Sequence, residues 1–596
     1  MTRGHSFRQT RGAAFALAAA VGAALAAPAF AQAPTSLFPN RPAPSAMPSD
    51  APVLPSNVLG VEDLQAVGGD SFGLRDGADG LGADLWRGAR RGQIIELMGL
   101  MPGATPSATM NALAQRLLLT TAAVPNGGNA AAPDSYLATR LDRLAALGDP
   151  ALAADLAQAA PGRGQDEAVV RVMTDAAFLV GAHDAACSEV RGALGTFGGD
   201  IGWRKALAFC QMIGNERPQA NLTAATLREQ SPQAAKDDTA FFALLAALGG
   251  DRNAKPASLP APTPLHVAML RAAKLAAPAD AFEAGDMAVL AALAQLPEGP
   301  LDARLAAAER AEAYGALPTS VLIKLYEELR FTQPQLANAL TGAESESGPR
   351  ARALLYGAQA RQGAAAARAV LIQRALSLSQ DAGLFPTSAR VYADALAGIP
   401  PTSDLAWFAA SATRALFAAG RIREGRAWLG ALGGGLGGGV GGTASGAQEL
   451  PPAVALLPYA LITAEPRSVP VWDAELWRRW RAAQGPLMAT RASLLLTLLE
   501  GLGRPAPEEA WDGLARARTD RADHLPAPSV LRTLEVSAAT DRKGLAVLAA
   551  LASFGPEGPA GTHPLVIGMA LAGLRNIGLE VEARALAVDA AIGAGL

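Results

Sequence analysis

The sequence predicts an all-α protein, a solenoid of stacked antiparallel helical hairpins, and three observations support this prediction. Gly148, Gly181 and Gly214 lie 33 residues apart, and Gly249 follows 35 residues later. Each of the first three is followed, five or six residues on, by an alanine in an apolar helical run. Long runs of alternating β-branched residues, which would indicate strands, do not occur. A fixed period in the thirties is typical of hairpins that bury their apolar faces by stacking on their neighbours.

Residues 1–31 have the composition of a secretory signal peptide. Three arginines precede an apolar run of about 15 residues, and Ala29 and Ala31 supply the small residues that signal peptidase requires. A membrane anchor is the alternative, but the run is shorter than the ~20 residues that span a bilayer as a helix. We expect cleavage after Ala31, with Ala33 as a second site. The Ala- and Gly-rich composition with few lysines indicates a bacterial source, so we expect a periplasmic protein, or alternatively a secreted one.

Composition divides the rest of the chain into four segments. Residues 32–82 are rich in proline and then in glycine and aspartate, which predicts a disordered tether. Residues 83–432 are expected to form an N-terminal helical repeat array, and 451–596 a C-terminal one. The glycine-rich run 433–450 contains G-x-G-x-x-G, but no strand precedes it, so a loop and not a phosphate site is expected. No later segment qualifies as transmembrane.

Helix start and stop signals predict the helices of the N-terminal array. Regular structure is expected to begin near Asp84, and a second helix follows Ser107, whose hydroxyl can cap the free amides. The helices expected next are 135–147, 151–159, 167–180, 182–194, 203–213, 219–229 and 239–248. At each turn the glycine should take the left-handed conformation, and a neighbouring Asp or Asn should cap the following helix.

The third hairpin resembles the tetratricopeptide repeat family. The residues that match the family's positions are Trp203, Leu207, Gly214, Ala220, Ala224, Leu227 and Pro232. The usual Leu-Gly pair is replaced by Ala206 and Leu207, and most of the family's tyrosines are missing. The resemblance covers about 115 residues well. Residues 203–210 also resemble a segment found in exported, alanine-rich bacterial proteins. The resemblance implies a helical scaffold, without cofactor, whose concave face binds a peptide or helix of a partner.

The C-terminal array is expected to contain helices at 472–484, 487–502, 507–518, 529–540, 544–554 and from 564 to the end. The last helix, expected at 579–592, would cap the array. Sequence alone leaves open whether the array is an open arc or a closed ring, because curvature depends on small rotations per repeat.

The chain's two cysteines are expected to form a disulfide. Cys187 and Cys210 lie on successive predicted helices, each about eleven or twelve residues from the turn near residue 198. Two antiparallel helices would bring them level, and an oxidising compartment would let the bond form. Two buried free thiols are the alternative. Neither cysteine has a Cys-x-x-Cys partner, and His183 is the only histidine near them in sequence, so no catalytic role is expected.

One aromatic cluster is a candidate partner surface. Trp477 and Trp480 share a helix face, and Trp472 lies just before them. Arg478, Arg479 and Arg481 are interleaved with these rings, and Arg478 and Arg479 are the arginines of the candidate surface. Tryptophan and arginine are enriched at binding hot spots. The alternative is that these tryptophans fill the core.

Other chemistry finds little support in the sequence. The four histidines after residue 31 lack metal-ligand spacing, so no metal or cofactor is expected. Glu327 and Glu328 are adjacent on a helix and point some 100° apart, so they do not form a facing acid and base pair. Loss of residues 1–31 removes three arginines and no acid, which takes the formal charge from −3 to −6 and gives no basic field for nucleic acid.

These observations favour a non-catalytic interaction scaffold, or an assembly factor, in the bacterial envelope. Its partner would be an envelope protein or peptide. The alternative from another class is a periplasmic enzyme or accessory factor that acts on peptidoglycan or surface polysaccharide.

Overall fold

The regular elements of the described residues are helices. A computed structural model of the protein describes residues 70–125, 135–161, 163–198, 200–346, 348–431, 452–465, 472–515 and 524–596. The expected signal peptide, the tether up to residue 69 and the glycine-rich loop 433–450 lie outside these residues. Extended pairing in the described residues is limited to three isolated bridges. The described residues belong to one compact unit, Gln65–Leu596, which contains both predicted arrays.

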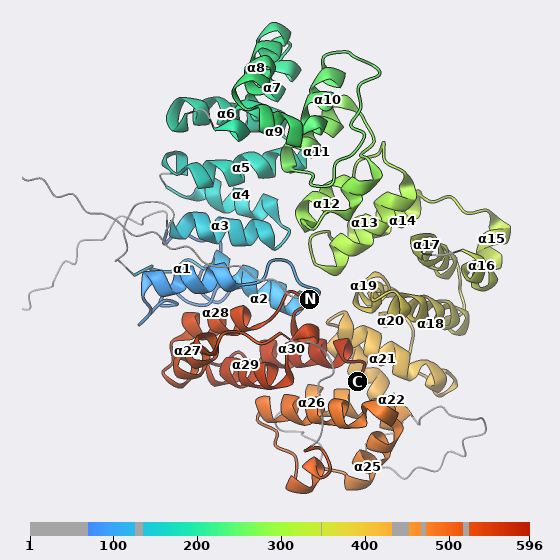
Figure 1. The fold of residues 1–596 in the computed structure, drawn as a ribbon. Helices are drawn as coiled ribbons and strands as arrows, with labels where there is room; N and C mark the ends of the chain where they lie inside the picture. The colour runs from blue at the N-terminus through green and yellow to red at the C-terminus, as the bar shows by residue number, and fades with distance from the viewer. Residues whose placement is uncertain are drawn as a thin grey trace, which may run out of the picture. The chain divides into compact units, whose positions relative to one another are not determined.

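The N-terminal helices follow the predicted hairpins closely (Figure 1). They are α1 (Arg91–Leu100), α2 (Ala108–Leu119), α3 (Tyr136–Ala146), α4 (Pro150–Ala159), α5 (Glu167–Val180), α6 (His183–Phe197), α7 (Ile201–Ile213), α8 (Arg217–Gln230), α9 (Pro232–Asp237) and α10 (Thr239–Leu248). Helices α3 and α4, α5 and α6, and α7 and α8 pack in consecutive pairs. Each pair buries an apolar face that one helix alone would expose.

The turns between these helices use left-handed residues, but not always the expected glycine. Gly148 (φ 90°) and Gly181 (φ 81°) end their helices in this conformation. At the third turn the left-handed residue is Asn215 (φ 62°), one position after Gly214. At the fourth turn it likewise moves on by one, to Gly250 (φ 104°). Asparagine tolerates this region because its short side chain bonds locally.

The middle of the chain departs from a regular hairpin period. Its helices are α11 (Pro264–Ala273), α12 (Met287–Ala294), α13 (Leu301–Ala313), α14 (Thr319–Glu328), α15 (Gln333–Ala337), α16 (Ala339–Ser345), α17 (Gly348–Gln359), α18 (Ala365–Asp381), α19 (Phe385–Val391), α20 (Ala393–Ala397), η3 (Ser403–Phe408), α21 (Ala409–Ala418) and α22 (Ile422–Ala431). The short helices α15, α16, α19 and α20 interrupt the pairing. The repeat is therefore clearest between α3 and α8.

The C-terminal helices are α23 (Pro452–Ala455), α24 (Leu457–Thr463), α25 (Ala474–Ala483), α26 (Met488–Gly501), η6 (Glu508–Trp511), α27 (Pro528–Ala539), α28 (Lys543–Ser553), η7 (Pro559–Gly561), α29 (Pro564–Asn576) and α30 (Glu580–Gly593). Where a helix was predicted at 507–518, the described residues contain only the short 3₁₀ turn η6. Gly513 follows at a φ of 77°, a conformation that an α-helix cannot include.

The first and last helices of the unit pack against each other. Helix α1 contacts α28, and α2 contacts both α28 and α30, as Figure 1 shows in blue and red. One apolar core combines buried side chains from α1–α5 with others from α24–α30. The amide of Gly544 donates to the carbonyl of Leu85 over 3.0 Å, and a Cβ at Gly544 would overlap that carbonyl. The two ends of the array are thus joined through a shared interior.

The last part of the predicted tether also belongs to this core. Leu81 is 2% exposed, and Leu85 and Trp86, which follow it, are as deeply buried. The amide of Leu74 donates to the carbonyl of Leu119 at the end of α2, over 2.9 Å. Residues 70–82 therefore pack on α2, and the predicted disorder is wrong for them. The sequence pattern misled because the segment's few apolar residues are spread among glycines and aspartates.

Packing also extends beyond neighbouring hairpins. Helix α5 contacts α11 and α12 as well as α4 and α6. Arg271 on α11 donates to the carbonyl of Leu179 over 3.0 Å, and Asn111 on α2 donates to that of Tyr314 over 3.0 Å. In a regular solenoid each repeat contacts only its neighbours. Here the chain's own later helices cover part of the faces of the first hairpins.

Candidate partner-binding surface and polar sites

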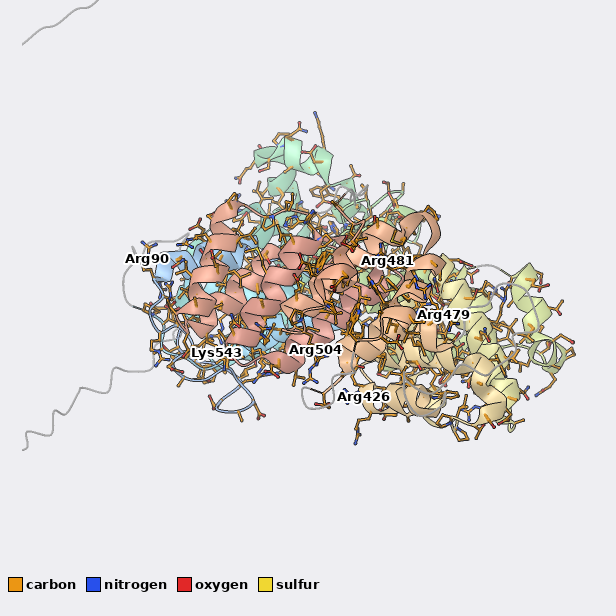
Figure 2. The ribbon with its side chains drawn as sticks, turned by 90° about the horizontal axis from the view of Figure 1, so that it is seen from below. Arg90, Arg426, Arg479, Arg481, Arg504 and Lys543 are labelled. Atoms are coloured by element: carbon orange, nitrogen blue, oxygen red, sulfur yellow. A yellow bond between two sulfur atoms is a disulfide. The ribbon has the colours of Figure 1, made fainter. Side chains whose placement is uncertain are left out.

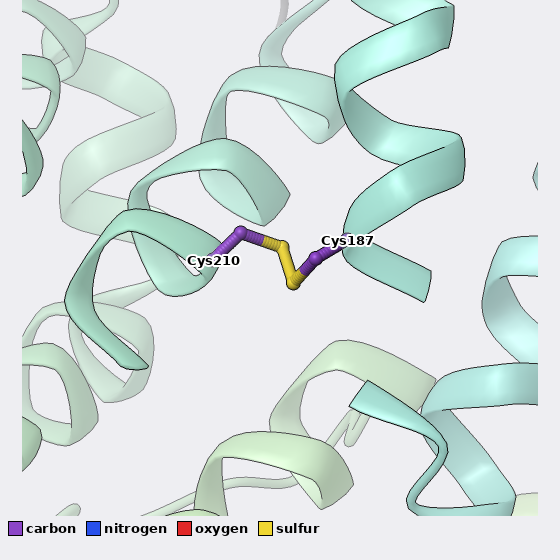
Figure 3. Close-up of a disulfide and its surroundings, with 2 residues drawn as sticks. All are labelled: Cys187 and Cys210. Atoms are coloured by element: carbon purple, nitrogen blue, oxygen red, sulfur yellow. A yellow bond between two sulfur atoms is a disulfide. The ribbon is translucent and has the colours of Figure 1, made fainter. Parts of the chain in front are cut away.

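The two cysteines form a disulfide between α6 and α7 (Figure 3). Their Cα atoms lie 5.5 Å apart, and both side chains are buried. Counting residues from the turn between the helices was enough to find this pair, because each residue of a helix advances 1.5 Å along its axis. The alternative of two free thiols does not hold in this structure. The bond fastens two neighbouring hairpins together.

The tryptophan cluster lies mostly inside the protein. Trp477 is 5% and Trp480 is 1% exposed, and their rings stack with centroids 5.3 Å apart. Trp472 is partly buried against the same core, 5.3 Å from Trp477. The rings of Trp477 and Trp480 fill space between α25 and its neighbours, which corrects the interpretation of these two residues as partner surface. When no partner protein covers a large apolar ring, burying the ring in the protein's own core lowers its free energy relative to leaving it in water.

The arginines of α25 differ from one another in their exposure to solvent. Arg478 is 75% exposed on its side chain and pairs with Glu475 one turn earlier. Arg481 lies over the Trp477 ring, with its guanidinium carbon 5.8 Å from the ring centroid. Arg479 lies on the same helix and is partly buried, so only Arg478 presents its charge fully to solvent. Figure 2 shows Arg479 and Arg481 near each other on the face seen from below.

His266 and Glu328 both form polar contacts with charged side chains. Across the residues that the structure describes, no group of three or more His, Cys, Asp and Glu is placed to hold a metal. His266 bonds Asp238 over 3.1 Å, and Lys205 lies 2.5 Å from the same carboxylate. Glu328 pairs with Arg304 over 3.0 Å, and not with Lys324 one turn away. These groups hold helices together.

A small polar pocket lies where the first and last helices meet, and no sequence pattern predicts it. Ser107, the cap of α2, accepts from the amide of Met110 and donates to Asp589 on α30. Burial raises the pKa of Asp589, against the hydrogen bonds from Ser107 and Thr109. Glu557 lines the same pocket, whose volume is about 60 Å³. Cavities that hold small molecules measure roughly 300–1,000 Å³, so this one is too small for a sugar ring.

The strongest candidate for a partner surface is Trp407 on η3. Its side chain is 46% exposed, a large exposure for a tryptophan. Its ring lies 5.5 Å from that of Phe408, which is fully buried, and Phe408 contacts Trp428 of α22 edge to face at 5.8 Å. A row of rings therefore runs from the core to the surface. The exposed ring is held on a rigid base, as binding hot spots are.

The length and hydropathy of each helix show whether it could span a membrane. Throughout the part of the chain that the structure describes, no helix is both long and apolar enough to cross a bilayer.

Comparison with known proteins found no match: no protein family matches the chain, and no curated protein or solved structure is significantly similar to it.

Proposed function

We propose that this chain is a non-catalytic protein-binding scaffold of the bacterial cell envelope, working in the periplasm after loss of residues 1–31. Three features support the proposal. The N-terminal sequence has the pattern of an export signal. The disulfide is of the kind that persists in oxidising compartments. The helices form paired hairpins, an architecture that offers broad binding surfaces.

The observation that carries the proposal is the exposed ring of Trp407. Tryptophan dominates the energetics of protein interfaces because it buries a large area at low entropy cost. The side chain lies on η3, which packs against α18 and α21, so its position is fixed by two longer helices. The partner is an envelope protein that offers an apolar pocket for this ring, framed by polar contacts.

The experiment places a photo-crosslinking amino acid at position 407 of the full chain in living cells. We expect one reproducible crosslinked envelope protein from this position. As a matched control, the same group replaces Leu565, which is 59% exposed on α29. Crosslinking that is equal at 407 and 565 would contradict the proposal.

A second arm tests affinity. Trp407→Ala should weaken recovery of the crosslinked partner at least tenfold, the loss expected for a hot-spot residue worth about 2 kcal/mol. Leu565→Ala should leave recovery unchanged. Trp407 is already half exposed, so its replacement should not unfold the protein, which a helical circular dichroism spectrum would check.

The alternative of an enzyme for peptidoglycan or surface polysaccharide depends on the pocket at Asp589. A buried acid with a raised pKa beside a second carboxylate is the arrangement that glycosidases use. The pocket's volume of about 60 Å³ disfavours this alternative. Release of soluble fragments from purified peptidoglycan, lost in Asp589→Asn, would favour it over the scaffold.

A further inference from the structure

A groove beside the start of α30 gathers three arginines and one acid. It lies between the end of α26, the end of α29 and the first turn of α30, and its volume is about 240 Å³. Arg504, Arg575 and Arg584 line it together with Glu580. The lining therefore carries an excess of two positive charges. Like charges so close repel each other, and this repulsion remains unless an anion offsets it.

The partners of these arginines leave most of that charge uncompensated. Arg504 donates to the carbonyls of Leu461, Ile462 and Ala464, which are neutral groups at the end of α24. Arg575 donates to the amide oxygen of Asn576 over 3.3 Å. Neither arginine forms an ion pair with a carboxylate among the described residues.

The third arginine shares its carboxylate. Glu465 lies 2.8 Å from Arg426 and 3.6 Å from Arg584, so its charge is directed first to Arg426. Figure 2 shows Arg426 and Arg504 close to each other along the same edge of the molecule. Burial lowers the pKa of Arg504, and the charges of Arg584 and Arg426 act in the same direction, against those of Glu465 and Glu580. The net effect on the positive charge of Arg504 is unfavourable.

The backbone is shaped around this cluster. Gly503 ends the segment after α26 with a φ of 72°, and Arg575 lies over its Cα so closely that a Cβ would overlap the guanidinium. Only glycine allows both the left-handed conformation and the close approach. The guanidinium group of Arg575 is therefore held against the turn at Gly503.

We propose that this groove binds a phosphate group. Arginine bonds tetrahedral phosphate oxygens with two parallel N–H donors, and three guanidinium groups around a small groove suit a doubly charged oxyanion. The groove also lies beside the first turn of α30, and the N-terminal end of a helix carries a partial positive charge. The phosphate belongs to a soluble phosphorylated molecule or to the headgroup of an anionic lipid.

Inorganic pyrophosphate is titrated into the full chain at low ionic strength, and binding is measured by isothermal titration calorimetry. We expect saturable binding of one pyrophosphate per chain. The double variant Arg575→Gln and Arg584→Gln should weaken it about a hundredfold, since each charge-assisted hydrogen bond contributes about tenfold. The control is Arg532→Gln, an arginine 71% exposed on its side chain that pairs with Glu535 on α27. This variant should bind as the parent does.

A second variant guards against a folding defect. Glu580→Gln removes the one carboxylate that lines the groove and should tighten binding several-fold. A gain of affinity cannot come from unfolding. The absence of saturable binding in the parent chain, or equal affinity in the parent, the double variant and Glu580→Gln, would overturn the proposal.

Vesicles distinguish the two sources of phosphate. Flotation is measured with phosphatidylglycerol vesicles and with phosphatidylcholine vesicles as the neutral control. Binding to the anionic vesicles that the double arginine variant loses identifies a lipid headgroup. Pyrophosphate binding without vesicle binding identifies a soluble ligand.

Discussion

Arg116 on α2 and Glu582 on α30, 466 positions apart in the chain, form an ion pair with 2.9 Å between nitrogen and oxygen. Their side chains are only 25% and 23% exposed. Arg116 also donates to the carbonyl of Gly80 over 2.8 Å, so it connects residues 70–82, α2 and α30. This single side chain joins the beginning of the folded unit to its end.

We predict that this pair contributes measurably to the stability of the joined ends. In a double-mutant cycle with Arg116→Ala and Glu582→Ala, the coupling free energy should be about 1 kcal/mol, at the upper end of the range for surface pairs. The pair Arg532 and Glu535, whose side chains are 71% and 62% exposed, is the control. Its coupling should stay below about 0.5 kcal/mol. Urea unfolding gives the four free energies, and equal coupling in both pairs would contradict the prediction.

The disulfide should stabilise the first hairpins. Cys187 and Cys210 are separated by 23 positions, and a loop of this size predicts about 3 kcal/mol in the chain-entropy model. The double variant Cys187→Ser and Cys210→Ser should therefore unfold at lower urea concentration than the parent. A reductant should shift the parent to the same midpoint and leave the variant unchanged. Two reactive thiols in the denatured, unreduced parent would show that the bond is absent.

The local parts of this fold were predictable because their signals are local. Helix α5 has the predicted bounds, since the carboxylate of Asp166 accepts from the amide of Ala168 at its start and Gly181 adopts a left-handed conformation at its end. The disulfide followed from counting residues on either side of one turn. The short helices α15, α16, α19 and α20 were missed, because helices of five to seven residues carry too few positions to show a period.

The long-range relationships were not predictable. Ser107 was expected to cap a helix, and it does, but nothing in its neighbourhood indicates that its hydroxyl also donates to Asp589. Trp407 and Trp428 look alike in sequence, yet one is 46% and the other 2% exposed. The groove at Arg504 brings together residues from α29, α30 and the segment that follows α26. Such sites depend on which helices meet, and a single sequence does not contain that information.

A buried ion pair in the middle of the chain should be sensitive to loss of one partner. The side chains of Glu309 and Arg352 are 3% and 9% exposed, and Arg352 donates through Nε over 2.7 Å. Tyr326 donates its hydroxyl to the same carboxylate over 2.6 Å, and burial, followed by the charge of Glu309, raises the pKa of Tyr326 well above 10. The phenol therefore stays a donor throughout the neutral range.

We predict that Arg352→Met lowers the free energy of unfolding by about 3–5 kcal/mol, because it leaves a buried carboxylate unpaired. The double variant Arg352→Met and Glu309→Leu should recover most of that loss, since no buried charge remains. Tyr326→Phe should cost only about 1–2 kcal/mol. Urea unfolding measures all three variants. A double variant that is less stable than Arg352→Met would contradict this account of the pair.

The carboxyl group of Asp175 on α5 should reduce stability at neutral pH. Burial raises its pKa from 3.8 to about 6; Arg171 opposes the rise, and Asp286, the cap of α12, adds to it. Between about pH 4 and pH 6 the folded state holds a proton that the unfolded state has released. The contribution of this group to stability therefore falls as the pH rises through that window, and it stays unfavourable above it.

Asp175→Asn should remove this dependence. At pH 7 the variant should be more stable than the parent by up to ~3 kcal/mol, since a shift of about two pKa units corresponds to that free energy. Near pH 3 the two proteins should be equally stable, because Asp175 is then protonated in both the folded and the unfolded states of the parent. Asp142→Asn, at a side chain 62% exposed beside Arg143, is the control and should leave the pH profile unchanged. Urea unfolding at several pH values measures the difference. A constant difference between parent and Asp175→Asn from pH 4 to pH 7 would mean that packing of the amide, and not titration of the acid, determines the effect.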